Sequence, residues 1–336
     1  MRRPPLRPVV WQPPRRPARA RQKHGTRPLP PLRLIPVSGN GPEDVVVDAD
    51  GRVLTGVEDG RILRISNEGR WIEQVADTGG RPLGIELLPD GRLLVCDGTR
   101  GLLRVDPESG AIDVLAYEVA GRPMLLCNNA AVAADGTVYF SDSSQRFTLE
   151  HWRGEMLEHS GTGRLLRRDP SGEIAVLLEG LEFANGVALA ADGSFVAVAE
   201  SGASQVRRVW LTGPRAGQDD VFLPNLPAVP DNMSTGSDGL IWIALASHRP
   251  LVLDLLHRSH PVFRRLAWRL PERLQPAESR VVWVLAVDDE GRVVHDLQGP
   301  GDQYHMVTAV REHHGRVYLG SLQHPAIAVL DLGRAR

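Results

Sequence analysis

The stretch Glu43–Arg52 reads EDVVVDADGR and joins a short apolar run to a turn that ends in glycine. The same arrangement of an apolar run, a turn and a second apolar run returns five more times. The six copies close on Gly51, Gly91, Gly136, Gly193, Gly239 and Gly315. Five of these turns read Asp-Gly, a strong hairpin signal between β-rich runs because glycine adopts a positive φ without steric cost. A repeat of roughly 40–50 residues built of strands predicts a β-propeller.

A second kind of hairpin lies between these copies and supplies the outer strands of each repeat. Two examples are Leu63–Gly69 and Leu103–Gly110. The apolar segment Leu34–Val37 has no partner in the first repeat, and one strand, Ala326–Leu330, follows the last copy. A ring closes if residues 33–37 complete the final blade, and closure removes exposed sheet edges. The sequence therefore predicts an all-β fold, a six-bladed β-propeller whose N-terminal strand closes the last blade.

Two segments fall outside this repeat. Residues 1–32 are rich in Pro and Arg and form a predicted irregular arm, whereas residues 33–336 form the predicted propeller. Residues 248–276 interrupt the fifth repeat, and their apolar spacing between prolines predicts one or two amphipathic helices. We interpret this insertion in blade five as a packed helical cap, with a substrate lid, a partner surface or a membrane surface as the alternatives.

Charge and composition limit the classes of function. The net charge is −2, but residues 1–33 contain ten Lys or Arg and no acid, so the body is acidic. An acidic body argues against nucleic-acid binding and is compatible with binding cations. No apolar run is long enough to span a bilayer, so we expect no membrane association, and the oligomeric state stays open. The two cysteines form no disulfide framework, and no apolar segment follows Arg2 and Arg3 as in an export signal, so we expect a cytoplasmic protein.

One register of the repeat gathers polar side chains. Eight residues before the turn glycines stand Glu43, Leu83, Asn128, Asn185, Asp231 and Val307. These positions begin the innermost strand of each predicted blade, so we expect them to converge at one end of the central channel. Two carboxylates and two amides there would repel one another or lack partners without a cation. Hard oxygen ligands of this kind suit Ca²⁺, less well Mg²⁺, and poorly Zn²⁺.

Several longer motifs resemble the strictosidine synthase-like branch of the six-bladed calcium propellers, whose relatives include paraoxonases, gluconolactonases and diisopropylfluorophosphatase. These motifs are Gly41–Val45, Gly80–Ile85, Val138–Ser144, Phe183–Val187, Leu226–Asn232 and Glu312–Leu322. The resemblance covers roughly residues 38–332. It implies an axial calcium site formed by the register residues Glu43, Asn128, Asn185 and Asp231, with Asn232 as a further ligand.

The chain departs from the family pattern at two positions. Hydrolytic relatives place a catalytic His where this chain has Leu83, and the plant synthases place a catalytic Glu where it has Thr308. We assign Leu83, Thr308 and His305 to substrate binding, and we do not expect a Pictet–Spengler condensation. Asp231 remains as the candidate general base or nucleophile beside the metal. His305 and His324, which flank the inner hairpin of the sixth blade, are the further candidates for a base.

These observations predict a calcium-dependent hydrolase that acts on a lactone or another ester as its small-molecule substrate. Two alternatives stay open. One is a lyase, or an enzyme that forms C–N bonds in specialised metabolism, with its site at the same end of the channel. The other is a propeller that binds a small molecule without catalysis and holds calcium as a structural ion.

Overall fold

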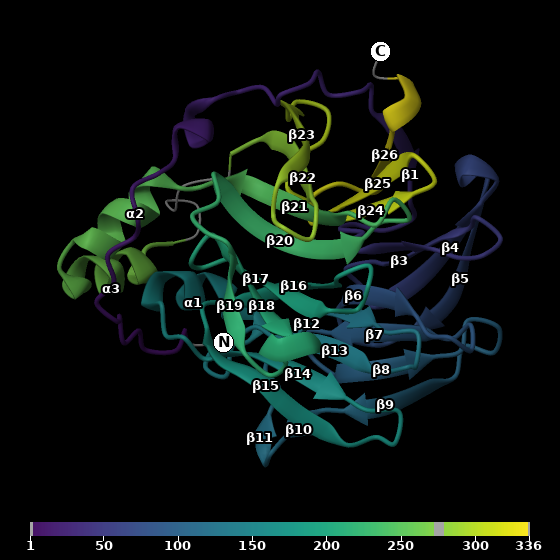
Figure 1. The fold of residues 1–336 in the computed structure, drawn as a ribbon, viewed down its shortest axis with the longest axis horizontal. Coiled ribbons are helices and arrows are strands. Elements are labelled where there is room, and N and C mark those ends of the chain that lie inside the picture. Colours follow the sequence, from purple (N-terminus) through teal and green to yellow (C-terminus); the bar gives the residue numbers. More distant parts are fainter. Residues whose placement is uncertain (1–2, 272–278, 335–336) are drawn as a thin grey trace.

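The computed structural model describes residues 3–271 and 279–334, and this part of the chain contains six four-stranded antiparallel sheets (Figure 1). Blade 1 contains β2 (Val45–Val47), β3 (Val53–Gly56), β4 (Arg61–Ser66) and β5 (Trp71–Asp77). Blade 2 contains β6 (Pro82–Leu87), β7 (Leu93–Asp97), β8 (Gly101–Val105) and β9 (Ile112–Ala116). Blade 3 contains β12 (Cys127–Val132), β13 (Val138–Asp142), β14 (Gly163–Arg168) and β15 (Ile174–Leu181). A small hairpin of β10 (Glu118–Val119) and β11 (Arg122–Pro123) connects blades 2 and 3.

The remaining three blades follow the same order of strands. Blade 4 contains β16 (Ala184–Leu189), β17 (Phe195–Glu200), β18 (Gln205–Trp210) and β19 (Asp219–Leu223). Blade 5 contains β20 (Ala228–Thr235), β21 (Ile241–His248), β22 (Val281–Val287) and β23 (Val293–Pro300). Blade 6 contains β24 (Val307–His313), β25 (Arg316–Ser321), β26 (Ala326–Asp331) and β1 (Arg33–Pro36).

The first strands of the blades form the inner ring of the propeller. They contact one another in the closed order β2, β6, β12, β16, β20, β24 and back to β2. Blade 6 is completed by β1, in which Ile35 lies opposite Ile327 of β26. The predicted six-bladed propeller and its closure by the N-terminal strand are therefore confirmed.

Close contacts between inner strands hold this ring together. A Cβ atom added to Gly186 of β16 would lie 2.3 Å from the backbone nitrogen of Met233 in β20. Any side chain at Gly186 would therefore push the two strands apart. Apolar clusters fill the space between adjacent blades; the one between blades 4 and 5 includes Phe195, Leu285 and the fully buried Trp283.

Three helices gather at the end of the ring where the inner strands begin (Figure 1). The sequence did not predict α1 (Trp152–Glu158), which lies between β13 and β14. The predicted insertion of blade 5 contains α2 (Leu251–Arg258) and α3 (Pro261–Arg269), and residues 272–276 of that prediction lie outside the described residues. The three helices contact one another, and we call them the helical cap. Among the described residues, no helix has the length and apolar character needed to cross a bilayer.

The N-terminal arm runs along the helical cap before it enters β1 (Figure 1). Three side chains of the blade 5 insertion donate hydrogen bonds of 2.8–2.9 Å to arm carbonyl groups: Arg249 to Pro14, Arg264 to Val9 and Trp268 to Pro4. Further along the arm, Arg19 forms an ion pair with Asp296 of β23. These contacts tie the arm to blade 5 on the same face of the propeller as the helices.

Candidate metal centre

The inner strands are irregular at the register that the sequence singled out. The strand pairing shifts between Cys127 and Ala130 in β12, between Ala184 and Val187 in β16, and between Pro230 and Met233 in β20. Bulges of this kind release residues from the ladder and redirect their side chains. The released pairs are Asn128 and Asn129, Asn185 and Gly186, and Asp231 and Asn232.

The five predicted metal ligands lie at the channel end of the inner ring. Four of them are buried, namely Glu43, Asn128, Asn185 and Asn232, and Asp231 is partly exposed. The side-chain amide of Asn232 donates to Glu43 Oε2 at 3.3 Å, and Asn185 lies within hydrogen-bonding range of the Asp231 carboxylate. The structure thus brings residues of blades 1, 4 and 5 together, and we call the five residues the mouth layer.

Three amide oxygens of the mouth layer have no hydrogen-bond partner. They are Oδ1 of Asn128, Asn185 and Asn232, in side chains that are 5%, 3% and 1% exposed. Leaving a buried acceptor unsatisfied costs about 1–3 kcal/mol, so such atoms need an explanation. Each of the three amide nitrogens has a protein partner, which leaves the oxygens for a group that the protein does not supply.

The surroundings of the two carboxyl groups of the mouth layer disfavour their ionised form. Burial raises the pKa of Glu43 well above its usual value, and the nearby Asp231 and Asp44 raise it further. Asp231 is partly exposed as a residue, yet protein atoms surround its carboxylate, and burial raises its pKa to about 7. A bound cation would reverse both effects, because opposite charge favours the ionised form of a carboxyl group.

Two serines fix the orientation of the asparagine amides in the same way. Asn128 donates to Ser143 Oγ at 2.9 Å, and Ser143 donates to the backbone carbonyl of β16 at 2.6 Å. In the next blade Asn185 donates to Ser201 Oγ at 3.1 Å, and Ser201 donates to the backbone carbonyl of Pro230 at 2.6 Å. The sequence carries no signal for a role of these serines, although Ser143 lies in one of the family motifs.

A second polar layer, which the sequence also did not reveal, lies deeper in the channel. Asp44 accepts hydrogen bonds from a backbone N–H of β6 at 3.1 Å and from Asn129 at 3.0 Å, and the Asn129 oxygen accepts from a backbone N–H of β16 at 2.8 Å. Arg311 pairs with Glu86 and donates to a carbonyl of β2 at 3.2 Å. Burial raises the pKa of Asp44 to about 7, and Arg311 opposes the rise. We call Asp44, Glu86, Asn129 and Arg311 the deep layer.

The residues assigned to substrate binding lie in different surroundings. Leu83 packs with Leu126 and Phe183, and part of α1 covers this apolar cluster through Trp152. The hydroxyl group of the fully buried Thr308 donates a hydrogen bond of 2.8 Å to the backbone carbonyl of Glu43. This bond holds the backbone of a mouth-layer residue in place. The contact of Thr308 with a substrate stays a prediction.

His305 contacts the neighbouring loop of blade 6 rather than the mouth layer. One ring nitrogen of His305 lies 3.0 Å from His324 and the other lies 3.0 Å from Gln323. Within the described residues, the ring hydrogen bonds of His305 and His324 join these two histidines to each other and to Gln323, and none of them reaches a predicted ligand. Their roles as substrate ligand or base stay predictions.

The donor set distinguishes among metals. In residues 3–271 and 279–334 no group of three His, Cys, Asp or Glu side chains is arranged to hold an ion. The mouth layer instead offers two carboxylates and three amides, all of which are oxygen donors. Such a set fits Ca²⁺ or Mg²⁺ and not the nitrogen and sulfur preference of Zn²⁺.

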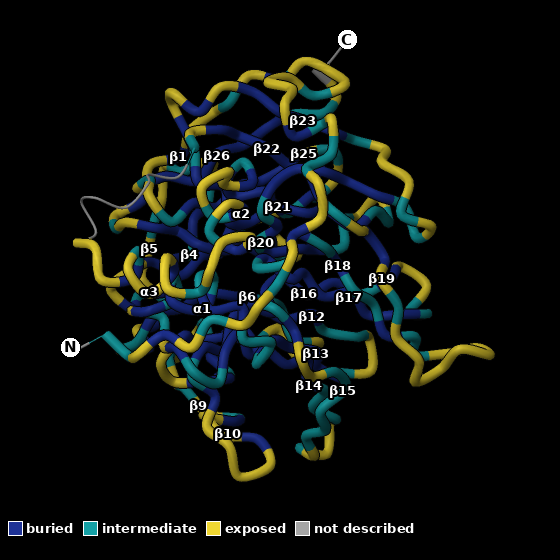
Figure 2. The backbone as a smooth tube through the Cα atoms, turned by 90° about the vertical axis from the view of Figure 1, so that its left-hand side faces the viewer, coloured by how far each residue is buried: buried dark blue, intermediate teal, exposed yellow. Residues whose placement is uncertain are grey.

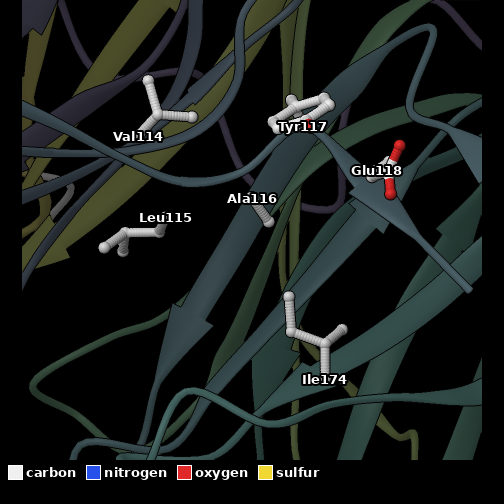
Figure 3. A pocket seen from close by; sticks show the side chains of 6 residues that line it. All are labelled: Val114, Leu115, Ala116, Tyr117, Glu118 and Ile174. Carbon is white, nitrogen blue, oxygen red and sulfur yellow. The ribbon is translucent and has the colours of Figure 1, made fainter. Parts of the chain in front are cut away.

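A hollow of about 450 Å³ lies elsewhere, on the outer strands of blades 2 and 3 (Figure 3). Its lining is Val114, Leu115, Ala116, Tyr117, Glu118 and Ile174. Apart from Glu118 these side chains offer no acid, base or nucleophile for chemistry at neutral pH. The mouth layer is therefore the stronger candidate for the functional site.

Fold and site together define a six-bladed β-propeller with oxygen ligands gathered at one end of its channel. The strictosidine synthase family model matches residues 128–214, and the model of the strictosidine synthase-like N-terminal region matches residues 29–65. Adipocyte plasma membrane-associated protein of Rattus norvegicus is 35% identical, over 89% of this chain and 85% of that protein. Protein strictosidine synthase-like 10 of Arabidopsis thaliana is 33% identical, over 90% of this chain and 89% of that protein. The chain belongs to the strictosidine synthase-like family.

A solved structure shares the fold at lower identity. The gluconolactonase from Xanthomonas campestris superimposes with a TM-score of 0.66 over 98% of both chains, at 16% sequence identity. At this identity the likeness concerns the propeller fold.

Proposed function

We propose that the protein is a hydrolase of a lactone or another ester that depends on Ca²⁺ at the mouth layer. The observation that carries this proposal is the set of three unpartnered amide oxygens beside two buried or crowded carboxylates. A calcium ion takes six to eight oxygen ligands, so five protein side chains leave positions for water and for a substrate carbonyl. When bound, the ion would polarise that carbonyl and stabilise the negative charge that develops on it.

Asp231 is the proposed general base. Of the two acids of the mouth layer, Asp231 is the residue that is partly exposed, whereas Glu43 is buried and serves as a ligand. A general base works best when its pKa lies near the working pH. Asn185 and the backbone of Asn232 hold the Asp231 carboxylate in place through hydrogen bonds.

The apolar cluster at the mouth supplies the proposed substrate wall. Leu83, Leu126 and Phe183 form it, and Leu149, Trp152 and Met156 pack against it from the α1 region. These side chains would hold the apolar part of an ester and limit the access of bulk water. Since Leu83 stands where a His would be needed, the proton must go to another group, which favours Asp231.

Thr308 argues against the C–N bond-forming alternative in the form that the plant synthases use. The resemblance places their catalytic Glu at this position, whereas the Thr308 hydroxyl is fully buried and donates to the carbonyl of Glu43. A propeller that binds a small molecule without catalysis would use the same mouth layer. The test below distinguishes this alternative from a hydrolase.

The test is a screen of lactones and aryl esters with and without a calcium chelator, followed by Asp231→Asn. We expect turnover that needs calcium, and a loss of about 10²-fold or more in kcat for Asp231→Asn, the usual scale for a general base. Asp113→Asn on the outer strand β9 is the matched control and should keep full activity. Calcium binding without turnover of any substrate would identify a binding protein, and normal kcat in Asp231→Asn would remove the proposed base.

A further inference from the structure

The two helices of the blade 5 insertion carry their side chains in an inverted arrangement. The buried residues of α2 are Asp254 and His257, and those of α3 are Arg264 and Trp268. The exposed side carries large apolar residues: Leu251, Val252, Leu255, Val262, Phe263 and Leu266, with Leu270 directly after α3. A helix pair that faces only water would place its leucines inward and its ionisable groups outward.

The buried polar side chains of these helices bind other groups of the protein. Arg249 binds the Asp254 carboxylate at 3.0 Å. Arg264 contacts His257 Nδ1 at 3.2 Å and donates to carbonyl groups of α1 and of the arm. The helices therefore cannot rotate to hide their apolar side without breaking these contacts. The exposed apolar face is a fixed feature of the fold.

The apolar face consists of seven exposed side chains that both helices contribute. Leu251 is 60% exposed, Leu255 is 61% exposed and Phe263 is 51% exposed. Figure 2 looks onto this side of the propeller and shows exposed positions along α2 and α3. In the arm beside them, Val9 and Val10 are also exposed. Apolar faces of this size mark interaction surfaces.

The exposed charges on α2 and α3 themselves are of one sign. Arg258, Arg265 and Arg269 are exposed on α2 and α3, and Asp254, the acid within residues 250–271, is buried against Arg249. The neighbouring arm adds ten Lys or Arg in residues 1–33 and no acid. Apolar side chains flanked by Arg, with no exposed acid among them, complement an anionic lipid surface.

We propose that α2 and α3 form a docking surface for anionic lipid membranes, with the apolar side chains entering the headgroup region and the arginines pairing with acidic headgroups. The sequence led us to expect no membrane association, because no apolar run could span a bilayer. An interfacial helix pair needs no such run. Since α1 lies between these helices and the apolar cluster at Leu83, docking would hold the channel mouth close to the lipid.

The test measures co-sedimentation of the full chain with phosphatidylcholine vesicles that contain or lack phosphatidylserine. We expect binding to the phosphatidylserine vesicles that weakens as salt is raised, because the arginine contribution is screened. The triple variant Leu255→Gln/Phe263→Gln/Leu266→Gln keeps helix-forming residues and should bind about tenfold or more weakly. Its melting temperature should match that of the unchanged protein, because these side chains are exposed.

The matched control changes three exposed apolar residues of outer strands, Trp71→Thr/Val221→Thr/Val294→Thr, and should bind vesicles normally. Arg265→Glu/Arg269→Glu should lose the preference for phosphatidylserine. Failure of the unchanged protein to bind these vesicles would overturn the proposal, as would equal binding by the triple variant. Concentration-dependent dimers that disappear in the triple variant, without vesicle binding, would assign the face to a second copy of the chain and also overturn it.

Discussion

The mouth layer and the deep layer share two pairs of neighbouring residues, Glu43 with Asp44 and Asn128 with Asn129, yet they satisfy their polar atoms in different ways. In the deep layer Asp44 accepts hydrogen bonds from N–H groups, and Arg311 supplies a positive charge from within the protein. In the mouth layer three amide oxygens lack partners, and burial and neighbouring carboxylates raise the pKa of Glu43 more than Arg81 lowers it. The deep layer thus carries its own cation, whereas the mouth layer gathers oxygen acceptors without one, which is the pattern that the proposed calcium site requires.

The largest expected effect comes from removing the built-in cation of the deep layer. Arg311→Met should leave Glu86 and Asp44 without their positive partner and destabilise the protein by about 3–5 kcal/mol, because a buried charge without its partner is costly. Chemical denaturation measures this loss, which should persist at saturating calcium. Arg104→Met, in an exposed pair with Asp113, is the control and should cost under about 1 kcal/mol. A loss for Arg311→Met as small as that of the control would contradict the contrast between the layers.

The second-largest expected effect is on calcium binding at the mouth layer. After exhaustive chelation, calorimetry should show tight binding of one Ca²⁺ and a raised melting temperature. Glu43→Gln should weaken calcium binding by about 10²-fold or more, since removing even an outer partner of a metal ligand typically costs about 10–100-fold. Asn185→Ala should also weaken binding, whereas Asn67→Ala in an outer hairpin of blade 1 should not. Unchanged affinity in Glu43→Gln would place the ion somewhere else.

The pH dependence sharpens the same comparison. Burial raises the pKa of Asp231 to about 7 in the metal-free fold, so between about pH 4 and pH 7 the folded chain holds a proton that the unfolded chain has lost. The contribution of Asp231 to stability therefore falls as the pH rises through this window, and calcium affinity rises because the ligand must ionise. Melting curves of chelated protein at pH 5.5 and pH 8 should show this fall, and a shallower one in Asp231→Asn. Equal slopes in the two proteins would argue against a raised pKa.

The smallest expected effect concerns the serines behind the asparagines. Ser143→Ala should free the Asn128 amide to rotate and weaken calcium binding by about tenfold, the low end for a partner that orients a ligand. Ser201→Ala should do the same through Asn185, and the exposed Ser109→Ala is the control. Ser143→Thr keeps a hydroxyl and should restore most of the affinity. If both alanine variants bind calcium normally, the amides are held by packing alone.

The register residues could be predicted because they obey a local rule. Each stands eight positions before a turn glycine, and strand periodicity carries Glu43, Asn128, Asn185 and Asp231 to one end of the channel. Asn232 does not follow from that count, and the resemblance supplied it. The bulge in β20 explains why: two consecutive residues leave the ladder, which regular alternation of side chains does not allow.

The parts that the sequence did not reveal depend on distances between strands. Ser143 and Ser201 follow their asparagines at different offsets, because the hairpins between them differ in length. In the sequence Asn129 is only the neighbour of the predicted ligand Asn128. Its hydrogen bond to Asp44 joins residues 85 positions apart in the chain, which the sequence does not reveal. The helix α1 has seven residues and is shorter than α2 and α3. It lies in a long connection whose apolar spacing gave no helical signal.

The pairing of β1 with β26 bears on how the chain reaches its fold. This pairing joins residues about 300 positions apart, as in Arg33 opposite Val329. Contacts of such long range form slowly, since much of the chain must be ordered before they can be made. During synthesis the N-terminal strand has to wait until the last blade has left the ribosome, with its hydrogen-bonding edge uncovered in the meantime. Blade 6 is therefore the expected last step of folding and the place where early aggregation would begin.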